Sequence, residues 1–233
     1  TQLLFIGLVV LVPFVLVMLQ PDFGSGMVLF FVWLFAFVFL TKNKKHIFLI
    51  VGLIVLSLVA SWFLVFKDYQ KDRILAFANP SRDPSGSGYN VKQSTIAVGA
   101  GGLMGKGLGF GSQSQLKFIP ESQTDFIFAV VAEELGLVGI LFLMAFYLIV
   151  FWRLYLIAIR APDDYAMFVA IMTASLIFIH LFINIGMCIG LLPVTGISLP
   201  FVSYGGSFLA SMLILIGIIN NIYRSSLMTK QGT

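Results

Sequence analysis

The sequence predicts an all-α integral membrane protein, a multi-span helical bundle with one long extracytoplasmic loop. Hydrophobic residues make up 59% of the 233 residues and charged residues only 10%, whereas a soluble domain carries roughly 25% charged residues. The mean hydropathy is correspondingly high, at +1.02. The apolar residues also gather in runs close to the ~20 residues that cross a ~30 Å hydrocarbon core.

Six apolar runs are long enough to be membrane spans. They lie at about residues 2–19, 24–40, 47–66, 135–159, 165–192 and 200–222. The first two are joined by Gln20-Pro21-Asp22-Phe23-Gly24, where proline and glycine break a helix, so these spans are expected to form a hairpin. The predicted organisation is three spans in 1–66, an outer loop in 67–126, and three spans in 127–233.

Lysine and arginine in the short connections predict the orientation. They lie near the end of or after the second, fourth and sixth spans, at Lys42, Lys44, Lys45, Arg153, Arg160, Arg224 and Lys230. The opposite connections, 20–24 and 192–200, contain neither residue type, so the positive-inside rule places the basic side and the amino terminus in the cytoplasm. The loop at 67–126 then lies outside.

Polar groups in the last two spans have packing interpretations. Leu192–Pro200 holds two prolines and a glycine, which indicates a break or a re-entrant segment. His180 and Asn184 are one helical turn apart, so they either line a cavity or, as we expect, hydrogen-bond a neighbouring helix. The small pair Ser203 and Ser207 favours close helix packing.

The outer loop carries half of the charged residues of the chain and a glycine-rich centre. Seven glycines lie between Gly99 and Gly111, a density that permits close approach of backbone N–H groups to an anion. No phosphate-binding pattern fits, because Gly107 stands where a serine or threonine should follow Lys106. A phosphate cradle and a set of tight turns therefore remain equal alternatives.

Asp125 stands where the polar loop meets the next apolar run. Ser122–Asp125 matches the frame of a capping box, so one interpretation is a helix start. Alternatively, a carboxylate at a poorly hydrated boundary suits a general base for a sugar hydroxyl. Nearby basic residues then supply cations for a pyrophosphate leaving group, unless they only face lipid. They are Lys106, Lys117, Arg73 and Arg82.

Glu133 and Glu134 follow within an otherwise apolar stretch. Acids at membrane depth are costly and suggest function, but a span that begins near Leu135 would leave both at the interface. At ~100° per residue, only Glu133 is able to share a helix face with Asp125.

Some site classes are excluded or not indicated. Cys188 is the single cysteine, so the chain has neither an internal disulfide nor a cysteine-based metal site. His46 and His180 lack companion ligands at metal-binding spacing. Basic residues do not alternate with aromatic ones, so nucleic acid is not an expected partner.

Four stretches of the chain resemble the SEDS family of shape, elongation, division and sporulation proteins, which includes RodA, FtsW and SpoVE. They are QPDFGSG at 20–26, NPSRDPSGSGYNVKQSTIAVGAGGLMGKG at 79–107, GSQSQLKFIPESQTDFIFAVVAEELG at 111–136 and NIGMCIGLLPVTGISLPFVSYGGS at 184–207. Members have about ten spans, so the resemblance implies that this chain corresponds to the carboxy-terminal six and that about four earlier spans are expected to be absent from it. Thr195 and residues 68–70 favour the RodA-like elongation branch, because division members commonly carry lysine at the position of Thr195.

The resemblance implies a peptidoglycan glycosyltransferase that polymerises lipid II. In that reaction the 4-hydroxyl of the acceptor GlcNAc attacks the anomeric carbon of the donor glycan and releases undecaprenyl pyrophosphate. The essential aspartate of the family falls on Asp125, which makes catalysis the preferred interpretation of this residue. The loop residues expected to contact substrate are Lys117, Glu121, Gln113, Ser114, Lys106 and Arg73.

Partners and location follow from the same resemblance. We expect a multi-pass protein of the bacterial inner membrane that works with a class B penicillin-binding protein transpeptidase and other membrane proteins of the elongation complex. A divalent cation, Mg²⁺ or Mn²⁺, is conceivable because Asp125 and Glu121 carry the oxygen ligands that such ions prefer. The alternatives are a lipid II flippase, suggested by His180 and Asn184 within a span, and a non-catalytic scaffold for a transpeptidase.

Overall fold

The computed structural model describes most of the chain as helices. The described residues are 2–20, 22–41, 48, 52, 71, 86–116, 118–119 and 121–231. The predicted span at 47–66 therefore lies outside them apart from Phe48 and Gly52. Contacts divide the chain into two units, Thr1–Tyr89 with Pro193–Thr195, and Asn90–Leu192 with Gly196–Thr233.

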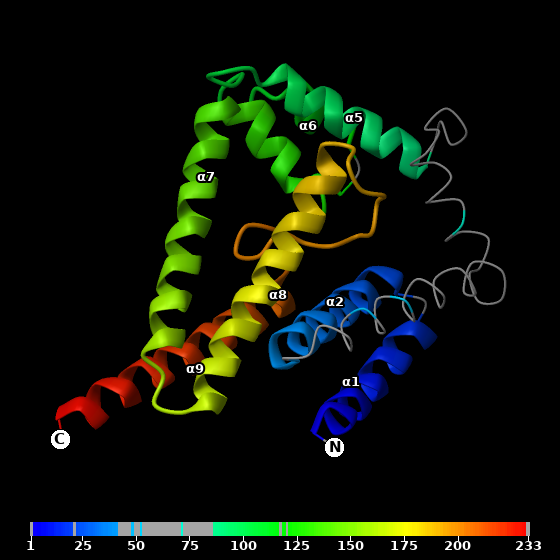
Figure 1. Ribbon diagram of the computed structural model, residues 1–233. Coiled ribbons are helices and arrows are strands. Elements are labelled where there is room, and N and C mark those ends of the chain that lie inside the picture. Colours follow the sequence, from blue (N-terminus) through cyan, green and yellow to red (C-terminus); the bar gives the residue numbers. More distant parts are fainter. Residues whose placement is uncertain are drawn as a thin grey trace. The chain divides into compact units, whose positions relative to one another are not determined.

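The first unit contains the predicted helical hairpin. Helix α1 (Gln2–Leu19) packs against α2 (Phe23–Leu40), and both are drawn in blue in Figure 1. The Asp22 side chain caps α2 by accepting a hydrogen bond of 3.1 Å from the Ser25 amide. Gly26 lets the helices approach, because a Cβ there would lie 2.8 Å from the Met18 sulfur.

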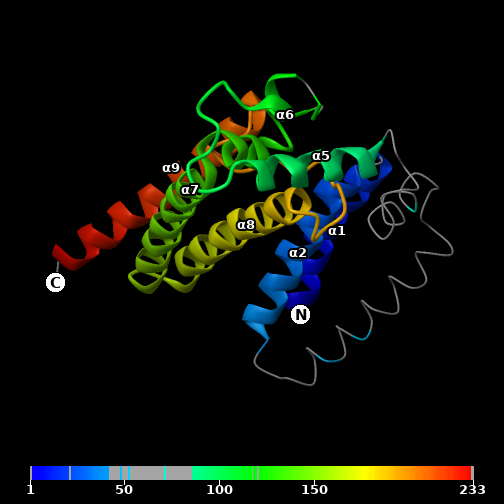
Figure 2. The ribbon, with the colours of Figure 1, turned by 90° about the horizontal axis from the view of Figure 1, so that it is seen from above.

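The second unit is built around two long helices. Its elements are the end of α5 (Ser87–Ala100), the short α6 (Ser112–Gln115), α7 (Ile127–Ile159), α8 (Asp164–Cys188) and α9 (Gly206–Gln231). Figures 1 and 2 both show α7 and α8 side by side. The Asp163 carboxylate caps α8 by accepting from the Ala166 amide at 2.7 Å. The connection between these antiparallel helices is short and comprises residues 160–163.

Four described helices are long and apolar enough to cross a membrane. They are Phe23–Leu40, Ile127–Ile159, Asp164–Cys188 and Gly206–Ser226. No strand occurs among the residues that the structure describes, and the prediction of an all-α, multi-span membrane protein is confirmed. Helix α8 ends at Cys188, earlier than the apolar run, because Gly190 takes a left-handed φ of 75° that stops a helix.

Helix α7 is broken at Gly136, within the region where the fourth span was expected to begin. Gly136 has φ 64° and ψ −158°, which separates a segment of residues 127–135 from a longer one of residues 137–159. Figure 1 shows the chain reversing its course between these two segments. Glu133 and Glu134 lie in the first segment and are 0% and 9% exposed, so both are buried inside protein.

The glycine-rich loop binds both segments of α7 through its backbone. The amides of Lys106 and Gly107 donate to the carbonyls of Glu133 and Glu134 at 3.0 and 2.9 Å. These bonds satisfy carbonyl groups that the end of a helical segment leaves without partners. In the other direction, the carbonyls of Gly102 and Leu103 accept from the amides of Leu137 and Val138 at 3.0 and 3.2 Å.

Close backbone contact explains why this loop needs glycine. A Cβ on Gly105 would lie 2.1 Å from the Glu134 carbonyl oxygen, and one on Gly101 would lie 1.8 Å from that of Ala132. Neither position has room for a side chain. The observed hydrogen bonds support the interpretation as structural turns over that of a phosphate cradle.

Candidate functional site

A tight turn of residues 121–126 carries Asp125 immediately before α7. The carbonyl oxygen of Glu121 accepts hydrogen bonds from the amides of Thr124 and Asp125, each at 3.2 Å, and its carboxylate accepts from the Thr124 hydroxyl at 3.0 Å. Glu121 has a positive φ of 53°, a conformation that costs a non-glycine residue about 1–2 kcal/mol. The turn is therefore held in place by contacts elsewhere.

The capping-box interpretation of Asp125 is not what the structure shows. Helix α7 begins at Ile127, its N-cap is Phe126, and no side chain caps it. Because Asp125 precedes the helix, the helical angle that placed Glu133 on its face does not apply. The structure therefore does not show the helix-capping role that was the alternative to catalysis for this residue.

Asn184 of α8 ties the Asp125 turn to the loop of residues 196–205. Its side-chain amide nitrogen, Nδ2, donates to the backbone carbonyls of Asp125 and Ile197, each at 2.7 Å. Asn184 is completely buried, and the Cys188 sulfur lies 3.9 Å from the same Asp125 carbonyl. One buried side chain thus fixes both segments on α8.

The loop of residues 196–205 forms hydrogen bonds with the two residues that precede Asp125 in the turn. The Ser203 hydroxyl donates to the Thr124 carbonyl at 2.6 Å, and the Tyr204 amide donates to the Gln123 carbonyl at 2.9 Å. Together with Asn184, these contacts bind three consecutive carbonyls, those of residues 123–125. The backbone under the Asp125 side chain is therefore clamped from two elements.

Further contacts hold that loop to the helices. The Tyr147 hydroxyl donates to the Pro200 carbonyl, and the His180 ring nitrogen Nδ1 lies 3.1 Å from the Ser198 carbonyl. Because a carbonyl only accepts, this contact selects the tautomer with hydrogen on Nδ1. His180 and Asn184 thus form hydrogen bonds inside the protein, but these partners are backbone carbonyls of non-helical segments, whereas a neighbouring helix was expected.

The Asp125 carboxylate lies beside the backbone of Gly196. A Cβ built on Gly196 would come within 3.5 Å of the carboxylate oxygen Oδ2, and Gly196 itself has a φ of 75°. Asp125 is only partly buried. The carboxylate therefore sits on a fixed backbone, next to a residue without a side chain.

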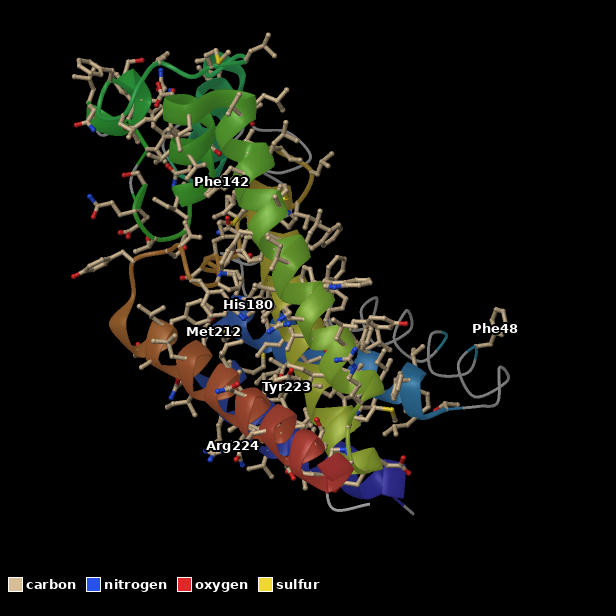
Figure 3. All side chains as sticks on the ribbon, turned by 90° about the vertical axis from the view of Figure 1, so that its left-hand side faces the viewer. Phe48, Phe142, His180, Met212, Tyr223 and Arg224 are labelled. Carbon is tan, nitrogen blue, oxygen red and sulfur yellow. The ribbon has the colours of Figure 1, made fainter. Side chains whose placement is uncertain are left out.

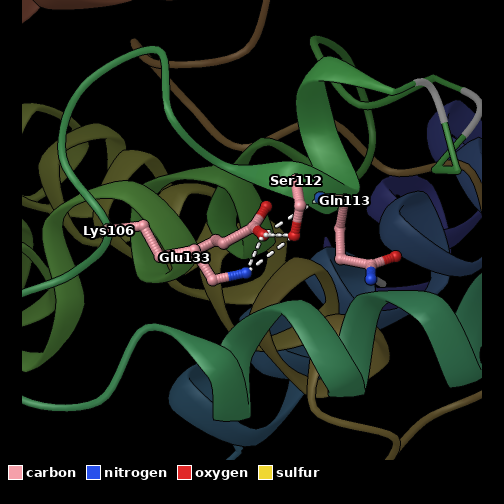
Figure 4. A network of polar contacts seen from close by, with 4 residues as sticks. All are labelled: Lys106, Ser112, Gln113 and Glu133. Atoms are coloured by element: carbon pink, nitrogen blue, oxygen red, sulfur yellow. Dashed lines mark hydrogen bonds and ion pairs between the residues drawn. The ribbon is translucent and has the colours of Figure 1, made fainter.

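A second polar cluster surrounds Glu133, as Figure 4 shows. The Lys106 ammonium and the Glu133 oxygen Oε1 form an ion pair at 2.8 Å. Oε1 also accepts from the backbone amide of Gln113 at 3.0 Å and from the Ser112 hydroxyl at 3.3 Å. The Lys106 ammonium also donates to the Ser112 hydroxyl at 2.8 Å. We call these four residues the Glu133 cluster.

The Glu133 cluster fastens the glycine-rich loop and α6 to α7. A fully buried carboxylate is tolerated only when it is paired and hydrogen-bonded, and Glu133 receives a cation and two further donors. The rise from Ile127 to Glu133 is about 9 Å along the helix axis, so the cluster is separate from the Asp125 turn. The sequence signal was an acid in an apolar stretch, but it did not identify Lys106 as the partner.

The structure distributes the predicted substrate-binding residues over two places. Asp125 and Glu121 share one turn. Lys106 and the Gln113 amide belong to the Glu133 cluster, and the Gln113 side-chain oxygen is buried without a hydrogen-bond partner in the described part of the chain. Ser114 lies in α6, whereas Lys117 and Arg73 fall outside the described residues, and their roles stay predictions.

The same chain matches known proteins along nearly its whole length. A model of the FtsW, RodA and SpoVE family, described as a cell cycle protein, matches residues 1–227. MrdB of Escherichia coli strain K12, named a peptidoglycan glycosyltransferase, is 43% identical over 214 residues, which are 92% of this chain and 58% of that protein. Stage V sporulation protein E of Bacillus subtilis strain 168 is 44% identical over 220 residues, which are 94% of this chain and 59% of that protein.

A solved structure extends this likeness to the fold. It is described as the structural coordination of polymerization and crosslinking by a peptidoglycan synthase complex, and one of its chains superposes with a TM-score of 0.75 at 30% identity. That match covers 95% of this chain and 61% of the other. The chain thus spans about three fifths of the length of these relatives. On the family model and these relatives together, the chain belongs to the FtsW, RodA and SpoVE family of membrane proteins.

Proposed function

We propose that the protein is a peptidoglycan glycosyltransferase that polymerises lipid II, with Asp125 as its catalytic base. Family membership and the name of the Escherichia coli relative, a peptidoglycan glycosyltransferase, support the reaction class. The proposal concerns the whole protein, because the chain spans only 58% of the MrdB relative.

The observation that best supports Asp125 as the base is that its backbone is held by hydrogen bonds from two elements. A general base must sit within hydrogen-bond reach of the proton that it takes, in a geometry fixed before the reaction. Hydrogen bonds to the carbonyls of residues 123–125 provide that fixation. The carboxylate itself lies beside Gly196, a residue without a side chain.

In the proposed reaction, Asp125 takes the proton of the acceptor 4-hydroxyl while that oxygen forms a bond to the anomeric carbon of the donor. The bond between this carbon and the pyrophosphate oxygen breaks, and undecaprenyl pyrophosphate leaves with the electron pair. Lys117 and Arg73 remain the proposed cations for the leaving group. Lys106 already neutralises Glu133, so its proposed contribution is to position the loop.

A divalent cation would need more ligands than the Asp125 turn presents. Among the described residues, no group of three or more histidine, cysteine, aspartate or glutamate side chains is arranged to hold a metal ion. Only Asp125 and Glu121 share the turn, and the Glu121 carboxylate binds Thr124. The residues described do not form a metal site by themselves, so we assign the metal no step.

The experiment is polymerisation of purified lipid II by the full-length protein and its Asp125→Asn variant, with Mg²⁺ and Mn²⁺ varied. We expect a loss of about 100-fold or more, the usual contribution of a general base. Asp164→Asn is the matched control, because it makes the same chemical change at an exposed aspartate in the first turn of α8. Glycan chains made at the wild-type rate by a folded Asp125→Asn protein would refute the assignment.

The role in cell elongation is a further part of the proposal. The two relatives carry the names of different branches, so the elongation role rests on Thr195 and residues 68–70. A class B transpeptidase is the proposed partner, and the solved complex that couples polymerization with crosslinking supports it. Restoration of rod shape, rather than division, in cells that lack the corresponding protein tests the branch.

The flippase and scaffold alternatives receive no specific support from the described residues. His180 and Asn184, which suggested transport, bind backbone carbonyls of residues 125, 197 and 198. Transport of labelled lipid II across vesicles without polymer would favour a flippase. Full elongation function of Asp125→Asn in cells would favour a scaffold.

A further inference from the structure

A groove of about 500 Å³ lies between the carboxy-terminal half of α7 and α9. One wall is formed by side chains within residues 149–160 and the other by side chains within residues 213–223. All of these residues belong to the second unit. The volume falls within the ~300–1,000 Å³ typical of small-molecule sites. Gly217 contributes to the space, because a Cβ there would meet nothing within 4 Å.

Most side chains that line the groove are apolar, and two of them are cationic. Arg153 and Arg160 both line it, and residues seven apart lie on the same face of a helix. Asn220 and Tyr223 add polar groups from α9, and none of the described lining residues is acidic. The nearby Asp163 carboxylate is used to cap α8. The positive charge of the groove is therefore not neutralised from within.

We propose that this groove binds an anionic glycerophospholipid. Its phosphate would bind Arg153 and Arg160, and an acyl chain would lie against Ile149, Leu213 and Ile216, which belong to the groove wall. Arginine matches phosphate oxygens with paired N–H donors. A soluble phosphate would leave the apolar wall unused, and an uncharged or zwitterionic lipid would leave the arginines without a net anion.

The charge pattern of the chain supports this source of phosphate. Arg153, Arg160 and Arg224 are at the side that the positive-inside rule places in the cytoplasm. The cytoplasmic leaflet carries anionic lipids, and basic pockets between membrane helices on that side bind their head groups. The site is distinct from the Asp125 turn, which precedes the other end of α7.

Native mass spectrometry of the full-length protein, with phosphatidylglycerol or phosphatidylethanolamine added in detergent, tests the proposal. We expect a preference of about tenfold or more for phosphatidylglycerol, since each arginine near a lipid head group contributes about a factor of five. The double variant Arg153→Gln with Arg160→Gln should lose this preference. Arg224→Gln is the matched control, because Arg224 is exposed on α9 next to Tyr223 but does not line the groove (Figure 3).

A second variant keeps both arginines and fills the space. Gly217→Leu should reduce phosphatidylglycerol binding without harming the fold, because no atom lies close to that position. Arg153→Lys with Arg160→Lys should retain most of the preference, which shows that charge and not misfolding is responsible. Equal binding of the two lipids, no bound lipid, or unchanged binding by Gly217→Leu would each overturn the proposal.

Discussion

Asn184 donates from one buried nitrogen to the carbonyls of Asp125 and Ile197. A polar side chain in a membrane span is costly unless it is satisfied. Here the partners are backbone groups of irregular segments, whose carbonyls are not paired within a helix and need donors from elsewhere. At the scale of single residues, the position of Asp125 thus depends on a side chain of another helix.

Replacing Asn184 should therefore affect both stability and catalysis. Asn184→Leu leaves two buried carbonyls without this donor, and each such loss costs about 1–3 kcal/mol. We expect a lower thermal midpoint and, at a temperature where the variant is folded, slower polymerisation of lipid II. Asn221→Leu, an exposed position on α9, is the control. Unchanged activity in a folded Asn184→Leu protein would show that the clamp does not serve catalysis.

At the scale of elements, α7 is two segments that share one apolar sequence. Hydropathy alone places a span start near Leu135, but the break at Gly136 and the two flanking hydrogen-bond pairs from the glycine-rich loop decide where the helix turns. The loop therefore belongs to the architecture of α7. Its glycines and the Glu133 cluster make separate contributions that mutation can distinguish.

Gly105 and Gly102 form a matched pair for the close backbone contact. Both have positive φ, so alanine strains either position by about 1–2 kcal/mol. Only at Gly105 does the added Cβ also meet backbone, 2.1 Å from the Glu134 carbonyl, which adds roughly 1–3 kcal/mol of overpacking. Gly105→Ala should consequently lower the thermal midpoint more than Gly102→Ala. Equal shifts would mean that the loop moves away from α7 without cost.

Breaking the Glu133 ion pair should destabilise the fold strongly. Lys106→Met leaves a fully buried carboxylate without its cation, a change that typically costs about 3–5 kcal/mol. The double variant Lys106→Met with Glu133→Gln should recover most of this loss, because the uncharged amide still accepts from Ser112 and Gln113. Thermal unfolding measures both, with Lys92→Met as the exposed control. No recovery in the double variant would contradict the electrostatic explanation.

At the scale of the whole molecule, the orientation in the membrane is open to a direct test. Phe110 is 78% exposed in the outer loop and Tyr165 is 76% exposed at the start of α8, while the native Cys188 is 0% exposed. In intact cells, a membrane-impermeant maleimide should label a Phe110→Cys protein. It should label Tyr165→Cys only after permeabilisation, because the positive-inside rule places that end in the cytoplasm. The reverse pattern would invert the predicted topology.

The sequence was most informative where the signal is local. Runs of apolar residues establish membrane helices from composition, and the Pro21–Gly24 turn indicates the first hairpin without any knowledge of distant residues. The ordered motifs identified the family, which the family model and the relatives confirm. Asp125 was singled out by its place at a boundary and by the resemblance together.

Only the tertiary structure decided which residues meet. Lys106 and Glu133, or Asn184 and Asp125, are separated by stretches of chain whose course hydropathy does not specify. The glycine-rich loop illustrates the reason: its composition allowed an anion site or tight turns, and the choice depended on the α7 carbonyls that its amides reach. By itself the sequence determined that the chain is a membrane-embedded helical bundle of a known family, because burial in lipid is a property of each segment. The clamp around Asp125 depended on the folded chain, because hydrogen bonds between distant segments exist only once those segments are packed together.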